Sequence, residues 1–112
     1  MKAAFAAGEP VTLPEIGHFA EGVAVKRTGD LTYHICARLL DEIITVDNDE
    51  ICAAVQDVYE DTRAIAEAAG VLAIAGLKKF FTERPGCEGN AAAVLSGANV
   101  NFARLRHIAE RA

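Results

Sequence analysis

The sequence predicts an α/β fold in which helices pack on a few, mostly parallel strands. Two short apolar segments, 42–46 and 91–95, have the composition of buried strands, and helical patterns separate them along the chain. Strands that are buried on both faces need a neighbour on each side, and the sequence shows no further confident strand pattern. We therefore expect a single structural unit, residues 1–112, with an incomplete sheet.

Two helices are expected before the first strand. Residues 2–7 have the pattern of a helix end that Gly8 stops, because glycine is common just past a helix C-terminus. A second helix should begin at position 29 or 30 and continue to about position 40. Its apolar inner face should carry Ile35, Leu39 and Leu40.

The helix after the first strand has the clearest beginning. Asp47 stands in the N-cap position and Glu50 follows three residues later, which is the pattern of a capping box. An apolar stripe then marks the buried side of the helix. It comprises Ile51, Val55, Val58 and Ile65.

The stretch 68–81 should form a helix with almost no polar face, and such a helix is buried in a larger body or against a partner. The strand 91–95 has at most one neighbour in the chain, and unpaired strand edges invite pairing with another copy. We therefore expect a homo-oligomer or a larger assembly. The candidate interface residues are Val71, Leu72, Ile74 and Leu77.

Composition excludes several classes of partner. The formal net charge of −5 argues against a nucleic-acid surface, and the basic residues of the last helix, 101–111, indicate a solvated face. No apolar run is long enough to span a membrane, and the N-terminus has no hydrophobic targeting core. The three cysteines show no CxxC spacing and the three histidines no ligand spacing. We expect a cytoplasmic protein without a metal site.

Residues 96–101, Ser-Gly-Ala-Asn-Val-Asn, carry the most informative pattern. They connect a strand to a helix at the sheet edge where open α/β folds bind ligands. Two more segments stand upstream, Phe-Ala-Glu-Gly-Val-Ala-Val-Lys at 19–26 and Ile-Ile-Thr-Val at 43–46. Through these motifs the whole chain resembles the biosynthetic threonine dehydratases, which are pyridoxal-phosphate lyases of the fold type II group. The resemblance covers the last part of the family's catalytic domain.

The resemblance implies a role at the cofactor for five residues. In the family, the serine that corresponds to Ser96 lies beside the pyridine nitrogen, where a neutral hydroxyl makes the ring a moderate electron sink suited to β-elimination. Gly97 and Asn99 would shape the turn behind it, and Gly22 would lie on backbone lining the pocket. Glu67 matches the glutamate of the family's Glu-Pro-Ser-Gly-Ala motif, although this chain reads Glu-Ala-Ala-Gly-Val there.

Each of these residues also has a structural interpretation that the sequence leaves open. Ser96 alone would be a turn residue that caps the final helix. Gly97 and Asn99 tolerate positive φ, which suits a plain turn. Gly22 would be a flexible turn glycine, and Glu67 a solvated carboxylate at a helix end.

Two parts that the family's reaction needs are missing from these 112 residues. No lysine follows a serine and an aromatic residue, which is the family's Schiff-base position, and no glycine-rich loop is present to bind the cofactor phosphate. The resemblance thus implies a fragment of an enzyme that converts L-threonine to 2-oxobutanoate and ammonia for isoleucine synthesis. We expect the chain alone to be inactive and to bind no pyridoxal 5'-phosphate stably. A complementing N-terminal chain would be its partner.

Two other functions fit the residues. The chain is alternatively a non-catalytic truncated homologue that self-associates or binds a partner, which the apolar stretch 68–81 favours. A weaker alternative is a small anion-binding protein that uses the turn before Asn101.

Overall fold

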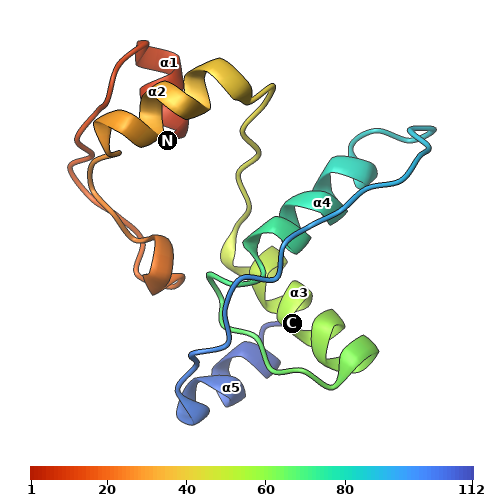
Figure 1. Cartoon of the computed structure of the whole chain (residues 1–112). Coiled ribbons are helices and arrows are strands. Elements are labelled where there is room, and N and C mark those ends of the chain that lie inside the picture. The colour runs from red at the N-terminus through yellow and green to blue at the C-terminus, as the bar shows by residue number, and fades with distance from the viewer.

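Six helices make up the regular structure of the computed structural model, which describes all residues from Met1 to Ala112. In chain order they are α1 (Lys2–Ala7), the short 3-10 helix η1 (Glu21–Val23), α2 (Asp30–Leu39), α3 (Asn48–Thr62), α4 (Leu72–Thr82) and α5 (Phe102–Ala109). Figure 1 shows α1 and α2 side by side at one end of the molecule, joined to α3 by an extended segment. Helices α3, α4 and α5 lie at the other end, and α3 contacts both of the others.

The beginning of α3 confirms the predicted capping box. The Glu50 N–H donates to the Asp47 carboxylate at 2.8 Å, and the Asp47 N–H donates to the Glu50 carboxylate at 2.7 Å. The helix ends at Thr62, where Arg63 takes the left-handed conformation with φ 60°. The predicted stripe is therefore correct only for residues within these bounds, and Ile65, which lies beyond the helix end, is exposed.

The hydrophobic core lies between α3, α4, α5 and the turn that precedes α4. Its side chains are small or medium in size, so each contributes a modest buried area. Ten buried residues form it: Ile51, Cys52, Ala54, Val55, Val58, Ala66, Ala68, Val71, Ala75 and Ile108. Burial raises the pKa of the Cys52 thiol, which keeps this core side chain protonated at neutral pH.

Helix α4 is shorter than the predicted helix 68–81. It begins at Leu72, because residues 68–71 form a turn. Val71 is fully buried within the chain, so its predicted place in an interface with another copy is wrong. Leu72 and Ile74 pack partly buried against the same core.

Helix α4 also has a polar side, contrary to the prediction of an apolar circumference. Lys78 forms an ion pair with Asp57, and Lys79 forms one with Glu50 at 2.9 Å. Both acidic residues belong to α3. These pairs join the two helices along the edge of their apolar contact.

The structure contains no β-strand, so the predicted parallel strands 42–46 and 91–95 are not confirmed. Both segments are non-helical and have no ladder of backbone hydrogen bonds to a neighbour. The only β-bridge is an isolated antiparallel one between Thr12 and Arg27. A strand requires a partner for its backbone groups, and no segment of this chain lies in that position. Val94 consequently has 72% of its surface exposed.

The predicted inner face of α2 is wrong, because Ile35, Leu39 and Leu40 are all exposed. Tyr33 is the buried residue of this helix. Leu31 precedes Ile35 and Leu39 at four-residue spacing and is 75% exposed. An apolar stripe on α2 is thus left uncovered.

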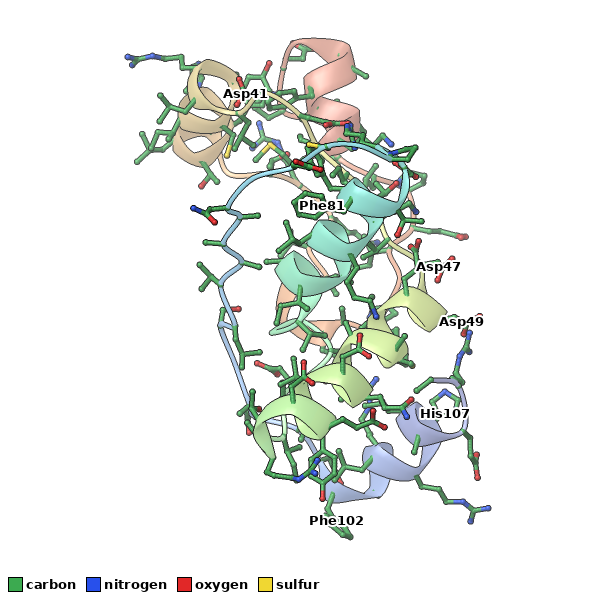
Figure 2. The ribbon with its side chains drawn as sticks, turned by 90° about the vertical axis from the view of Figure 1, so that its right-hand side faces the viewer. Asp41, Asp47, Asp49, Phe81, Phe102 and His107 are labelled. Atoms are coloured by element: carbon green, nitrogen blue, oxygen red, sulfur yellow. The ribbon has the colours of Figure 1, made fainter.

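The helices are too short or too polar to cross a membrane; the longest, α3, has 15 residues. The largest exposed apolar side chain belongs to Phe102, which projects away from the body of the molecule at the start of α5 (Figure 2).

Candidate functional site

Two segments that carry predicted site residues pair through their backbones, the turn 67–71 and residues 96–97. The Glu67 N–H donates to the Gly97 carbonyl oxygen at 3.1 Å. In return the Ser96 N–H donates to the Gly70 carbonyl oxygen, also at 3.1 Å. The two segments are far apart in the sequence, so the fold itself brings Glu67 to the Ser96–Gly97 motif.

Both segments carry a glycine where they cross, and the Gly70 position admits no larger residue. A Cβ atom at Gly70 would lie 2.8 Å from the Gly97 nitrogen and 3.0 Å from its carbonyl carbon. A Cβ atom at Gly97 would lie 3.1 Å from the carboxyl carbon of Glu67. The Gly70 contact is with hydrogen-bonded backbone, which cannot withdraw without losing its partners, whereas the Glu67 side chain can rotate away.

A third segment, the arm formed by residues 19–26, reaches the same turn. The 3-10 helix η1 within the arm holds Gly22 against Ala69, and a Cβ atom at Gly22 would lie 2.9 Å from the Ala69 Cβ. The predicted site residues Gly22 and Gly97 therefore both pack on the turn 67–71, which contains Glu67.

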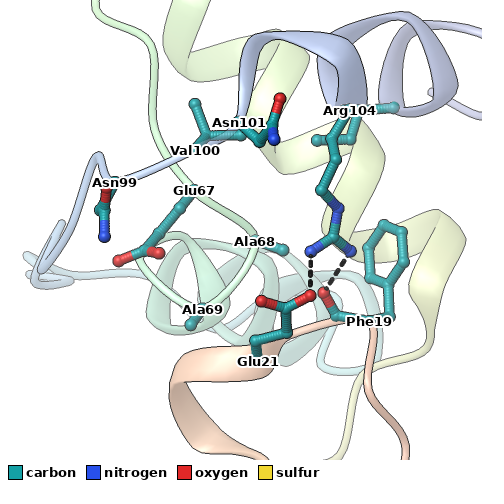
Figure 3. A pocket seen from close by; sticks show the side chains of 10 residues that line it. Phe19, Glu21, Glu67, Ala68, Ala69, Asn99, Val100, Asn101 and Arg104 are labelled. Carbon is teal, nitrogen blue, oxygen red and sulfur yellow. Dashed lines mark hydrogen bonds and ion pairs between the residues drawn. The ribbon is translucent and has the colours of Figure 1, made fainter.

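A pocket of about 450 Å³ opens where these segments meet the start of α5 (Figure 3). Of the five predicted site residues, Glu67 and Asn99 line it directly. The complete lining consists of Phe19, Glu21, Glu67, Ala68, Ala69, Asn99, Val100, Asn101, Arg104 and Ile108. Two carboxylates and one guanidinium give its wall a mixed polar character.

Ser96 is not part of the wall of this pocket. Its side chain is exposed, and its hydroxyl makes no hydrogen bond within the chain. It does not cap α5, since the cap is Asn101, whose Oδ1 accepts the Ala103 N–H at 3.0 Å. The interpretation of Ser96 as a helix cap is therefore wrong, and its hydroxyl has no structural partner.

The Glu67 carboxylate is half-buried and accepts no hydrogen bond from a side chain or backbone group of the chain. Figure 3 shows it on the same side of the pocket as Asn99. Because a carboxylate that loses water contacts needs a donor, this group is the natural point of contact for a ligand donor in the pocket.

Arg104 is the pocket residue that sequence reasoning missed. The sequence predicts a solvated basic face for the last helix, whereas the Arg104 guanidinium donates to Glu21 at 2.8 Å and to the Phe19 carbonyl oxygen at 2.9 Å. The partners are more than eighty residues away in the sequence. No local pattern could have revealed this contact.

The comparisons with known proteins place the chain in a family. Residues 1–98 match the family model described as pyridoxal-phosphate dependent enzyme. The biosynthetic L-threonine dehydratase of Salmonella typhimurium is 57% identical over 111 residues, which are 99% of this chain and 22% of that protein. This chain therefore spans about a fifth of the length of that relative.

Solved structures agree with the sequence match. The processed form of threonine deaminase isoform 2 from Solanum lycopersicum superposes with a TM-score of 0.92 at 38% identity, over 96% of this chain and 31% of that one. Maize serine racemase superposes with a TM-score of 0.79 at 28% identity, over 96% of this chain and 35% of that one. The chain belongs to the family of pyridoxal-phosphate dependent enzymes.

Proposed function

We propose that this chain forms the pyridine end of the cofactor site in a threonine dehydratase, which converts L-threonine to 2-oxobutanoate and ammonia and so supplies isoleucine synthesis. The observation that carries the proposal is the convergence of three segments, the arm 19–26, the turn 67–71 and the motif 96–101, around one pocket. The names of the similar proteins support the same reaction.

The residues present fit one end of pyridoxal 5'-phosphate. The Ser96 hydroxyl has no partner in the chain and would donate a hydrogen bond to the pyridine nitrogen while both groups stay neutral. Gly97 has no side chain and so leaves room for the Glu67 carboxylate beside it, and Asn99 and this unpaired carboxylate line the pocket. When bound, the cofactor supplies an electron sink for loss of the substrate's α-proton.

The remaining parts of the site must come from outside these 112 residues, which contain neither the family's catalytic lysine motif nor its glycine-rich phosphate loop. We propose a complementing polypeptide that carries both. The unpaired segment 91–95 and the uncovered stripe of α2 are the surfaces available to it. This chain superposes on 31% of the tomato threonine deaminase, so most of that protein has no counterpart in these 112 residues.

Mixing the purified chain with a polypeptide that carries the lysine motif and the phosphate loop tests the proposal. The chain alone should neither dehydrate threonine nor shift the absorbance of added pyridoxal 5'-phosphate, whereas the mixture should do both. Ser96→Ala should lower turnover of the mixture about tenfold, the equivalent of one hydrogen bond. Thr32→Ala, which removes an exposed hydroxyl on α2, is the matched control and should have no effect. Turnover by the chain alone, or equal effects of both variants, would contradict the proposal.

A second function is favoured by the uncovered stripe of α2. Its exposed residues Leu31, Ile35 and Leu39 would pair with the same stripe of a second copy in a non-catalytic, self-associating module. Light scattering at micromolar concentration should then show a dimer that Leu31→Lys dissociates. A monomer would exclude this function and leave the first one standing.

A further inference from the structure

The arm 19–26 has one polar anchor to the C-terminal helix, and that anchor is Arg104. Its guanidinium donates through Nη1 to the Glu21 carboxylate at 2.8 Å and through Nη2 to the Phe19 carbonyl oxygen at 2.9 Å. It also lies 5.6 Å from the centre of the Phe19 ring. Figure 3 shows both hydrogen bonds crossing from α5 to the arm at the mouth of the pocket.

The apolar side of the same contact involves a second residue of α5. The His107 ring meets the Phe19 ring edge-on, with centroids 6.2 Å apart. Phe19 and Ala20 are partly buried against the core cluster. Arg104 and His107, one helical turn apart, thus both contact Phe19 from α5.

The far end of the arm is held by one backbone bond, from the Leu13 N–H to the Lys26 carbonyl oxygen at 2.8 Å, and few contacts hold the residues between. The 3-10 helix η1 is closed only by local bonds, such as the Val23 N–H to the Ala20 carbonyl oxygen at 3.1 Å. Val23 and Val25 are exposed. A Cβ atom added at Gly22 would meet only Ala69, and glycine has no side chain that could anchor the segment by packing. The position of η1 therefore depends on Phe19, which precedes it, and on its first residue Glu21, both of which Arg104 binds.

We propose that Arg104 is a positioning residue, which fixes η1 so that Gly22 stays packed against the turn 67–71. It acts through Glu21 and Phe19 and does not itself contact a cofactor. Its importance for catalysis rests on the proposed function, but its effect on the arm does not.

The geometry predicts that the positive charge of Arg104 is not sufficient by itself to hold the arm 19–26 in place. The Glu21 side chain is 73% exposed, and an ion pair so open to solvent contributes little. Arg104 differs from a simple charge because its planar guanidinium group binds a carboxylate and a carbonyl oxygen together and also lies over an aromatic ring. Lysine keeps the charge but cannot form this arrangement.

Hydrogen–deuterium exchange on the full 112-residue chain tests the proposal. Arg104→Ala should raise amide exchange in peptides covering residues 19–26 about tenfold, since hydrogen bonds from a charged group are lost. Arg104→Lys should raise exchange in these peptides by nearly the same factor, and the exchange rates of peptides from α3 should be unchanged in both variants. The matched control is Arg106→Ala, which removes an arginine of the same helix that pairs only with Glu110.

Four results would overturn the proposal. The first is an unprotected arm in the unmodified chain. The second is an equal increase in Arg106→Ala, and the third is faster exchange throughout α3, which would indicate general destabilisation. The fourth is slow exchange of the arm in the double variant Arg104→Glu with Glu21→Arg, because the exchanged charges alone would then hold the arm.

The effect of Arg104 on cofactor binding is measured separately, in the mixture of this chain with the complementing polypeptide. Arg104→Ala should raise the pyridoxal 5'-phosphate concentration at half-saturation while leaving the spectrum of the saturated complex unchanged. Unchanged half-saturation would contradict a role of the arm in the site. A mixture that binds no cofactor even with the unmodified chain would refute the proposed function, and the exchange result would still decide whether Arg104 fixes the arm.

Discussion

Residues 1–46 and residues 47–112 fold by different means. The first part contributes two buried residues, Ala4 and Tyr33, whereas all ten members of the core cluster lie between Ile51 and Ile108. Both parts have amphipathic helices, and their difference lies in whether the apolar faces find partners within the chain. In the second part α3, α4 and α5 cover one another, while α2 leaves its stripe in solvent.

This difference between the two parts determines which segments of the candidate site are rigid. The turn 67–71 and the motif 96–97 belong to the self-covered part and are joined by backbone bonds. The arm 19–26 belongs to the other part and depends on side-chain contacts with α5. Each exposed leucine of α2 forgoes roughly 1.5–3 kcal/mol of burial. The N-terminal part is thus stabilised fully only when another surface covers it.

The largest effect is expected at the crossing of the two paired segments. Gly70→Ala should destabilise the chain by about 3 kcal/mol, because its Cβ atom would press into the backbone of Gly97. Gly76→Ala is the control, since Gly76 lies within α4 with open space around it. That change should instead stabilise the chain by about 0.5–1 kcal/mol through helix propensity. Urea denaturation measures both, and a loss of stability in both variants would contradict the close-packing argument.

A smaller effect separates the core from the uncovered stripe. Val71→Ala should cost about 2 kcal/mol, because the side chain is fully buried and a cavity remains. Leu31→Ala removes a larger side chain but should change stability by less than about 0.5 kcal/mol, since that side chain already lies in water. Thermal or urea unfolding of the two variants measures the difference. Equal costs would show that the α2 stripe is covered in solution, which would remove the distinction between the two parts.

Local rules in the sequence were sufficient for features that depend on neighbouring residues. The Asp47–Glu50 capping box and the stop at Gly8 were predicted because the interacting groups stand a few residues apart. The strand predictions failed for the opposite reason. Segments 42–46 and 91–95 have strand composition, but strand formation depends on partners that these residues do not contain.

The candidate site shows the same limit. The motif resemblance placed Gly22, Glu67 and Gly97 in one site, and the structure brings them together. It gave no indication of Arg104, because a hydrogen bond between residues so far apart follows from the tertiary fold and has no sequence pattern. The sequence alone allows Ser96 to cap the final helix, but the turn extends to Asn101 before α5 begins.

The smallest effect concerns the ion pair that joins α4 to α3. The hydrogen bond from Lys79 to Glu50 is the main cause that raises the pKa of Lys79 above its ordinary value of 10.5. A group whose pKa is higher in the folded state contributes stability below its unfolded pKa and loses it as pH rises through the folded pKa. The contribution should therefore be complete at neutral pH and disappear only in strongly alkaline solution.

Comparing Lys79→Met with the unmodified chain isolates this contribution, because methionine keeps much of the apolar stem and removes the charge. The difference in urea midpoint should be small at about pH 8, since both side chains are partly exposed, and smaller still at about pH 11.5. Ionisation of the Cys52 thiol, whose pKa is also raised, destabilises both proteins at high pH and cancels in the comparison. A difference that stays constant between the two pH values would show that Lys79 stabilises the contact by packing and not by its charge.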